Sequence, residues 1–219
     1  MNKQKNCIID MKNISFEYIR RSADGQEILG EQKVLEGFNI KIFEGSFIAI
    51  KGANGVGLTT LGRLICGKLI PGEGDMTVCG YDIFDASERE EIKKIVGMTE
   101  SNPAEYFTQT LIREEAAYSW GKELLRITGL YEKKNSTIDK LSYGEKSCLG
   151  IASVLASKPR IAVFDQAAAG IDSDKKIKII DYIAGLCEKE GLTAIWLTNN
   201  SMEEEIINVN NPEWSGVYL

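Results

Sequence analysis

The sequence of 219 residues predicts an α/β protein built on a parallel sheet that helices cover on both faces. The first observation is that short strands, apolar at nearly every position, alternate with helix-forming segments; these strands are Phe47–Lys51, Ile161–Phe164 and Thr193–Leu197. Such strands are typical of a sheet buried on both faces. The second observation is that the first strand leads directly into a glycine-rich segment, Gly52–Gly57, and then into a helix.

Hydropathy periodicity and turn residues place the other elements along the chain. We expect strands at Cys7–Tyr18, Phe38–Ile42 and Gly74–Cys79, a long surface loop at Arg20–Gln32, and helices at Thr59–Cys66, Ser87–Lys94, Gln109–Gly129, Gly144–Ser157 and Ser173–Glu190. No internal repeat or low-complexity linker divides the sequence, so we expect a single domain.

The composition excludes several classes of function. The chain has no histidine, so it cannot form a Ser-His-Asp triad, a Cys-His nucleophile or an imidazole base. Its net charge of −6 argues against nucleic-acid binding, which is usually marked by a basic patch. Five scattered cysteines without a C-x-x-C pair indicate reduced thiols in a cytosolic protein. Because no apolar run approaches the roughly 18 residues of a bilayer span, we expect a soluble protein unless a partner brings it to a membrane.

The segment from Gly52 to Thr60 (GANGVGLTT) is a candidate phosphate-binding loop. Glycines let consecutive backbone N–H groups turn toward an anion, the following helix adds its dipole, and a Ser or Thr hydroxyl binds Mg²⁺. Leu58 stands where such a loop has the lysine that reaches the β- and γ-phosphates. Without that lysine, an ordinary strand-to-helix turn is the alternative interpretation.

Two further motifs are ambiguous when each is taken alone. Ser142 and Glu145, in the segment LSYGEK, have the spacing of a capping box, which by itself indicates only the start of a helix. Asp165 ends an apolar strand. At the carboxyl edge of a parallel sheet such a residue can hold Mg²⁺ through water, but a lone aspartate there is also a common cap.

The order and spacing of these motifs resemble the ATP-binding subunit of an ABC transporter. The glycine loop is followed by Leu-Ser-x-Gly-Glu, by an aspartate 23 residues after Ser142, by Gly170-Ile-Asp172, and by a strand that ends at Thr198. The resemblance covers nearly the whole chain. The segments Asn13–Tyr18, Val96–Met98 before Asn102-Pro103, and Ile151–Ala156 resemble the energy-coupling-factor branch, whose members import cobalt and vitamins.

The resemblance implies a P-loop NTPase (RecA-like) fold. This is a mixed sheet with flanking helices, an N-terminal antiparallel β part and a helical subdomain. It implies a single nucleotide-binding domain over 1–219, with a core of 1–102 and 159–219 and a helical subdomain at about 103–158. Because only 37 residues separate Pro103 from Leu141, we expect the helical subdomain to be shortened and its groove for a membrane subunit to be altered.

The resemblance also implies roles for individual residues. Tyr18 would stack on adenine, and Thr59 and Asp165 would hold Mg²⁺. The ATP-binding positions would be Tyr18, Gly52, Asn54, Gly55, Gly57, Leu58, Thr59 and Thr60. The signature motif and D-loop, represented by Ser142, Gly144, Glu145 and Asp172, would complete the ATP site of a partner subunit in a head-to-tail dimer.

Tyr143 and Glu145 modify the signature motif, and four further departures from the family pattern fall on positions that serve the chemistry. Leu58 replaces the phosphate-binding lysine, Gln166 the catalytic glutamate, Ser101 (or Glu100) the Q-loop glutamine, and Asn199 (or Asn200) the switch histidine. Loss of the lysine removes a charge-assisted contact of ~1.5–3 kcal/mol. Loss of a general base typically costs ~10²–10⁴ in rate. We therefore expect weak ATP binding and no useful hydrolysis at this site.

Three functional hypotheses follow. The preferred one is a degenerate ATP-binding subunit that pairs with a second ABC-type ATPase and donates Ser142 and Gly144 to its partner's site. A heterodimer is the favoured form of this pair, and a homodimer is the alternative. This pair would sit in the cytoplasm on the inner face of the cell membrane, bound to a membrane transporter subunit through the Q-loop and helical-subdomain groove. The alternatives are a pseudo-ATPase used as a regulatory module without transport, and a slow but active ATPase that uses Asp165 and Thr59 to hold Mg²⁺.

Overall fold

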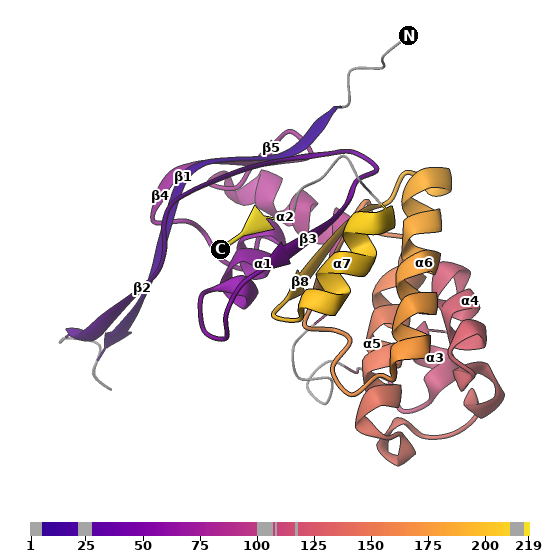
Figure 1. Ribbon diagram of the computed structural model, residues 1–219. Helices are drawn as coiled ribbons and strands as arrows, with labels where there is room; N and C mark the ends of the chain where they lie inside the picture. The colour runs from indigo at the N-terminus through magenta and orange to yellow at the C-terminus, as the bar shows by residue number, and fades with distance from the viewer. Residues whose placement is uncertain (1–5, 22–27, 100–106, 108, 117, 211–216) are drawn as a thin grey trace, which may run out of the picture.

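Two β-sheets form the framework of the computed structural model, which describes residues 6–21, 28–99, 107, 109–116, 118–210 and 217–219 (Figure 1). The parallel sheet has the strand order β6 (Val96–Met98), β7 (Ile161–Asp165), β8 (Thr193–Thr198), β3 (Phe47–Lys51) and β9 (Val217–Tyr218). The antiparallel sheet has the order β2 (Ile28–Phe43), β1 (Cys7–Arg21), β4 (Glu73–Val78) and β5 (Tyr81–Asp82). The predicted α/β class with an antiparallel N-terminal part is therefore confirmed.

Helices cover both faces of the parallel sheet. One face carries α3 (Ile112–Ala116), α4 (Ser119–Ile127), α5 (Tyr143–Ala156), α6 (Ser173–Glu190) and α7 (Ser201–Asn210), with the short 3-10 helices η2 (Leu130–Lys133) and η3 (Ile138–Lys140). The other face carries α1 (Leu58–Ile65) and α2 (Ala86–Ile95), with the antiparallel sheet beyond them. The predicted helices begin and end within one residue of the observed ones, apart from the segment Gln109–Gly129.

Side chains of the parallel strands alternate between two apolar cores. In β8, Ala194 and Trp196 enter the core under α5 and α6, whereas Ile195 and Leu197 enter the core between the two sheets. The same alternation holds in β3 and β7. This arrangement is the reason why these strands are apolar on both of their faces.

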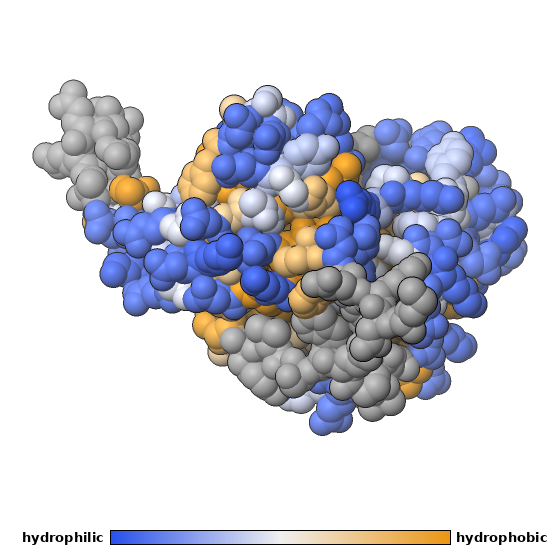
Figure 2. All heavy atoms as spheres, turned by 90° about the horizontal axis from the view of Figure 1, so that it is seen from above, coloured by the Kyte–Doolittle hydropathy of each residue, from blue (hydrophilic) through white to orange (hydrophobic). Residues whose placement is uncertain are grey.

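The predicted surface loop at Arg20–Gln32 is wrong. Strand β1 continues to Arg21, β2 begins at Ile28, and Tyr18 pairs with Gln32 in a two-stranded arm (Figure 1). In the described part of the chain, β1 pairs with β4 only as far as Ser15, so the arm is not covered by a third strand. Figure 2 shows mainly hydrophilic side chains along it. A strand pair without a buried face lacks the apolar alternation that reveals strands in a sequence.

The helix predicted over Gln109–Gly129 is two helices, α3 and α4. Ser119, the first residue of α4, has φ of 49°, which a continuous helix cannot contain. Gly121 lies against the carbonyl oxygen of Ala152 in α5, where a β-carbon would collide. The structure also contains β6 and α7, which the sequence did not predict. Strand β6 has three residues, too few for a periodic pattern, and α7 carries an acidic run instead of a clear apolar stripe.

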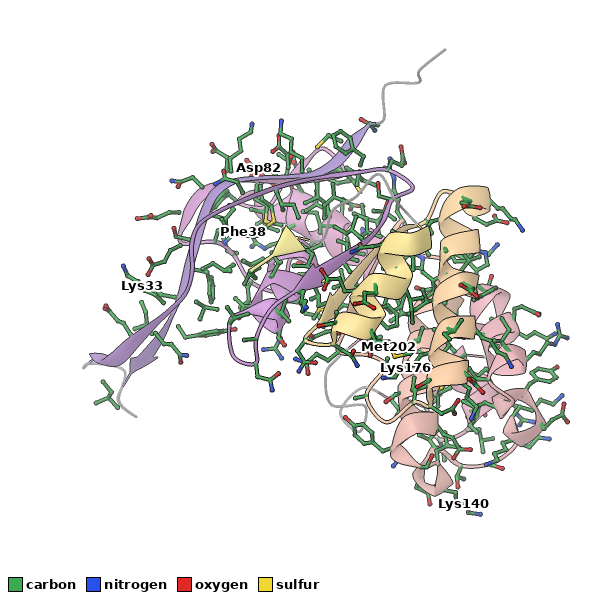
Figure 3. The ribbon with its side chains drawn as sticks, viewed as in Figure 1. Lys33, Phe38, Asp82, Lys140, Lys176 and Met202 are labelled. Carbon is green, nitrogen blue, oxygen red and sulfur yellow. The ribbon has the colours of Figure 1, made fainter. Side chains whose placement is uncertain are left out.

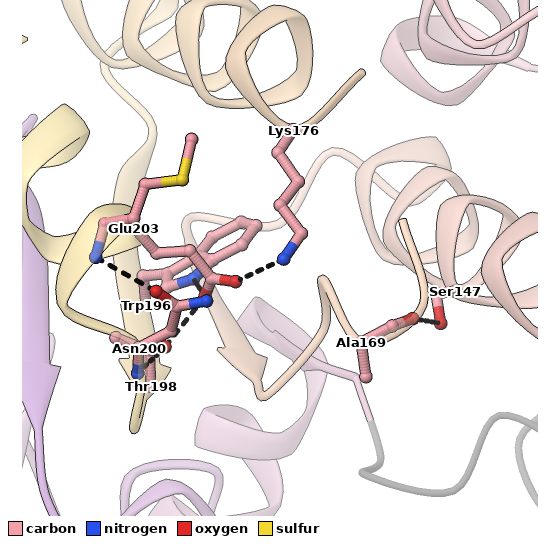
Figure 4. Close-up of polar contacts among 8 residues, drawn as sticks. Ser147, Ala169, Lys176, Trp196, Thr198, Asn200 and Glu203 are labelled. Carbon is pink, nitrogen blue, oxygen red and sulfur yellow. Dashed lines mark hydrogen bonds and ion pairs between the residues drawn. The ribbon is translucent and has the colours of Figure 1, made fainter. Parts of the chain in front are cut away.

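A buried charge network attaches α7 to the rest of the domain (Figure 4). The carboxylate of Glu203 forms an ion pair with Lys176 of α6 at 3.0 Å. It also accepts hydrogen bonds from the Trp196 indole at 3.0 Å and the Thr198 hydroxyl at 2.7 Å. Figure 3 shows Lys176 close to the start of α7. Because the two charged side chains are only 6% and 15% exposed, each depends on the other for compensation.

Removal of the Glu203 carboxylate should destabilise the fold strongly. Glu203→Ala leaves Lys176 without its counter-ion and two donors without an acceptor, and breaking a buried pair in this way costs about 3–5 kcal/mol. Urea unfolding should show this loss, whereas Glu205→Ala, at an exposed position of the same helix, should change the free energy of unfolding by less than about 0.5 kcal/mol. Equal stability of the two variants would contradict the role assigned to Glu203.

Candidate nucleotide site and signature surface

The glycine loop lies between β3 and α1, where the sequence places it. Gly55 and Gly57 have φ of 80° and 116°, in the left-handed region that favours glycine. Gly57 caps α1 without a side-chain hydrogen bond, so the first N–H groups of the helix are available to an anion. Val34 of β2 packs against the loop, and a β-carbon on Gly57 would lie 2.6 Å from its Cγ1. This geometry fits a phosphate-binding loop.

The two residues predicted to hold Mg²⁺ are in direct contact. The Thr59 hydroxyl donates a hydrogen bond to Oδ2 of Asp165 at 2.7 Å, and the Asp165 side chain is fully buried. The Asp165 N–H in turn donates to the Thr99 hydroxyl at 2.8 Å. A hydroxyl and a carboxylate are the oxygen ligands that Mg²⁺ prefers, with water and substrate phosphates completing its shell. The residues present therefore fit the ion.

Leu58 gives the loop an apolar wall. It is the first residue of α1, and its side chain is only 3% exposed because it belongs to the core between the two sheets. It borders a pocket of about 180 Å³ that opens beside the loop. The residues that line this pocket are Tyr18, Gln32, Val34, Ala53, Gly55, Gly57, Leu58, Thr59, Thr60 and Gln166. Since none of them is a cation, none replaces the missing lysine.

Tyr18 lies at the mouth of this pocket, at the base of the β1–β2 arm. Its hydroxyl shares a hydrogen bond of 3.2 Å with the Thr60 hydroxyl, and its ring packs edge-on against Phe16 with centroids 4.9 Å apart. The ring is 37% exposed, so part of it remains open to a ligand. Gln32 and Val34 also line the pocket. Their role was not predicted from the sequence, because they lie in or beside the segment that was predicted to be a loop.

The two positions expected for catalysis lie at the same edge. Gln166 follows β7 and has a φ of 45°. Its N–H donates a hydrogen bond to the Leu197 carbonyl at 2.9 Å. In this conformation the residue lines the pocket together with Thr59. The Asn199 amide donates to Oδ1 of Asn54 in the glycine loop at 2.6 Å. Asn200 instead accepts a hydrogen bond from the N–H of Met202 at the start of α7. Asn199 is therefore the residue that reaches the loop.

The residues expected at the Q-loop position, Ser101 and its alternative Glu100, lie outside the described residues. The structure adds Thr99, which immediately precedes them and holds the backbone of Asp165. Thr99 could not be predicted as a site residue, because the strand before it has only three residues.

The signature residues form a second pocket of about 180 Å³. Its lining residues are Thr128, Leu130, Ser142, Gly144, Glu145, Cys148, Gly170, Ile171, Asp172 and Lys175. The predicted capping box is present: Ser142 Oγ accepts from the Glu145 N–H at 3.3 Å, and the Glu145 carboxylate accepts from the Ser142 N–H at 2.9 Å. Gly144 touches the Gly170 carbonyl, where a β-carbon would collide. The motif and the D-loop segment therefore form one surface.

Charges around this surface are paired. Lys133 contacts Glu145 at 2.6 Å, and this contact, together with the Ser142 N–H, lowers the pKa of the Glu145 carboxyl. Asp172 caps α6 through the Lys175 N–H and pairs with the Lys175 ammonium at 3.0 Å, which lowers the pKa of Asp172. Burial raises the pKa of the Cys148 thiol to about 12, so this cysteine is not a thiolate nucleophile.

A strand leads through a glycine loop into a helix, and a hydroxyl of that helix contacts a carboxylate at the end of a second strand. This arrangement defines a P-loop nucleotide-binding domain. The sequence over residues 35–169 matches the family described as ABC transporter. The chain therefore belongs to the ABC transporter family, as an ATPase domain. Within the described residues, no helix has the length and apolar character needed to span a bilayer.

Individual relatives support the predicted branch. The energy-coupling factor transporter ATP-binding protein EcfA of Syntrophomonas wolfei is 32% identical over 77% of this chain and 67% of its own. EcfA1 of Clostridioides difficile is 29% identical over 91% and 74%. A putative ABC transporter ATP-binding protein of Vibrio vulnificus is 28% identical, and this chain spans 34% of its length. The dimeric ATP-binding cassette MJ0796, bound to ADP and Pi, shares the fold with a TM-score of 0.76 at 22% identity over 90% of both chains.

A cation restored at position 58 should strengthen ATP binding. We expect the native chain to bind MgATP with a Kd above ~100 μM and Leu58→Lys to bind roughly ten- to a hundredfold more tightly, because the ammonium supplies a charge-assisted contact. Leu58→Met, which keeps the position apolar, is the matched control. Isothermal titration calorimetry with and without Mg²⁺ measures the three affinities. A sub-micromolar Kd for the native chain would contradict the argument from Leu58.

Proposed function

We propose that this chain is a degenerate ATP-binding subunit of an energy-coupling-factor-type transporter. Its own glycine-loop site does not support turnover, and its signature surface completes the ATP site of a second, intact ABC-type ATPase subunit. The observation that carries the proposal is the contrast between the two pockets. Leu58 is a buried apolar residue beside the glycine loop, whereas Ser142 is exposed at the signature pocket with Gly144 next to it.

The glycine-loop site retains groups for binding but not for proton transfer. Thr59 and Asp165 are in place for Mg²⁺, and the backbone of the loop is open to phosphate. Gln166 can orient a water molecule but cannot accept its proton. Where a general base is required, its loss lowers the rate by a factor of ~10²–10⁴. Asn199 is uncharged and already bonded to Asn54. The replaced residues all belong to one site, so the effects of their replacement on the rate of hydrolysis are not additive.

The signature surface is available to another subunit. The two pockets share no lining residue, and Figure 1 shows the start of α5 well separated from the start of α1. A chain with this geometry does not bring Ser142 to its own glycine loop. We assign Ser142, Gly144 and Asp172 to the site of a partner, which makes a head-to-tail heterodimer with an intact subunit the functional form.

The relatives' names supply the setting for this pair. They are ATP-binding proteins of energy-coupling factor transporters, so we propose that the pair binds a membrane transporter subunit and works on the cytoplasmic face of the membrane. We place the contact in the helical subdomain at about 103–158, which contains α3, α4 and α5. The core of 1–102 and 159–219 would carry the nucleotide-binding sheet.

A substitution at Ser142 tests the donation of the signature. In a complex of this chain with an intact energy-coupling-factor ATPase subunit and a membrane subunit, Ser142→Arg should lower ATP hydrolysis at least tenfold, because the long side chain fills the place of the γ-phosphate. Ser87→Arg makes the same change at an exposed position of α2, outside the helical subdomain and both pockets, and should leave the rate unchanged. An unaffected rate with Ser142→Arg, or failure of the three chains to associate, would overturn the proposal in favour of a regulatory module.

The isolated chain tests the slow-ATPase alternative. Its kcat should not exceed that of Asp165→Asn, which keeps the shape of the side chain but loses the carboxylate for Mg²⁺. Phosphate release at saturating MgATP measures both rates, with circular dichroism as the check that the variant is folded. A kcat clearly above that of Asp165→Asn would show that the glycine-loop site turns over.

A further inference from the structure

Three cations surround the ring of one tyrosine in the helical part of the domain, outside both pockets. The Lys134 ammonium lies 4.2 Å from the centroid of the Tyr131 ring, the Arg126 guanidinium carbon 5.1 Å and the Lys122 ammonium 5.8 Å. Lys122 and Arg126 stand four residues apart on α4, and therefore on one face of that helix. Tyr131 belongs to η2, and Lys134 is the first residue after η2.

Two of these three charges have no carboxylate partner among the residues that the structure describes. Glu123 pairs with Arg126 at 3.0 Å. For Lys122 and Lys134, the structure places no carboxylate within 4.0 Å among the residues it describes. Both lysines are half-buried, so solvent screens their charges less than it would on an open surface. A ring face attracts each cation but does not neutralise it.

We propose that Lys122, Arg126, Tyr131 and Lys134 form a binding site for a phosphate group, carried by a small phosphorylated molecule or by a phospholipid headgroup. Ammonium and guanidinium groups gathered around one ring are the kind of donors that phosphate oxygens require. A bound phosphate would also supply the negative charge that the two lysines lack. The site lies apart from the glycine loop, so it does not depend on nucleotide binding there.

Two further observations support this assignment. The cations lower the pKa of Tyr131, first through the hydrogen-bonding Lys134 and then through the charge of Lys122, as a locally positive potential does. The segment that carries the tyrosine is also fixed on both sides. Leu130 is 2% exposed, and Lys133 pairs with Glu145 of α5. Because the backbone that carries Tyr131 and Lys134 is held in place, no ordering of this segment is needed when a ligand binds.

Residue-resolved NMR of the full chain tests the site. Inorganic phosphate, titrated at constant ionic strength, should produce saturable shifts of the Tyr131 and Lys134 amide signals, with a Kd of about 1–10 mM. Signals of Gly55 and Gly57 report separately on the glycine loop. The double variant Lys122→Gln/Lys134→Gln should weaken binding at Tyr131 at least tenfold. The matched control Lys178→Gln/Lys189→Gln removes two exposed charges from α6 and should leave it unchanged.

Vesicle flotation identifies the source of the phosphate. If phosphatidylglycerol vesicles carry the native chain and the control, but not the Lys122→Gln/Lys134→Gln variant, the ligand is a lipid headgroup. If vesicles carry none of them while phosphate still binds at Tyr131, the ligand is a soluble phosphorylated molecule. The proposal is overturned if phosphate does not shift the Tyr131 signal, or if both double variants weaken binding equally.

Discussion

The parallel register of β3, β8 and β7 fixes where the groups of the candidate nucleotide site meet. Lys51 lies opposite Thr198, and Asp165 lies opposite Leu197, so the three strands end at one edge of the sheet. The glycine loop, the position of the missing base and the switch position follow these strand ends directly. A slip of one residue would exchange the core-facing sets of side chains and move the Asp165 carboxylate away from the loop. Packing opposes such a slip, because the large rings of Phe164 and Trp196 fill the core under α5 and α6 and would be moved into the other core.

Charge, rather than apolar burial alone, holds the segment beyond β8 in place. Glu203 binds α7 to α6 and β8, and Glu204 pairs at 3.1 Å with Lys51, the residue before the glycine loop. Asn199 lies between β8 and this anchored helix. It is therefore held over the loop, where it meets Asn54 at 2.6 Å. The two buried glutamates thus help to position Asn199, the residue expected at the switch position.

The sequence was sufficient for the elements whose pattern reflects burial. The apolar strands, the stripe of α6 and the Ser142–Glu145 capping box are local signals, and the structure contains all of them. Contacts set by tertiary packing could not be predicted. The polar β1–β2 arm has no buried face, and the approach of Val34 to Gly57 depends on how the two sheets stack. The proximity of Asp165 to Thr59 was predicted from the family resemblance and not from the periodicity of the sequence.

Contacts of the protein itself hold the glycine loop where a bound nucleotide would otherwise order it. Leu58 buries an apolar side chain, which contributes about 1.5–3 kcal/mol relative to an exposed one. The Asn199–Asn54 bond and the packing of Val34 on Gly57 fix the loop from two sides. These contacts are made within the protein and do not involve a bound phosphate. Under the function proposed for this subunit, its stability no longer depends on its own nucleotide, and its contribution to catalysis is confined to the signature surface around Ser142.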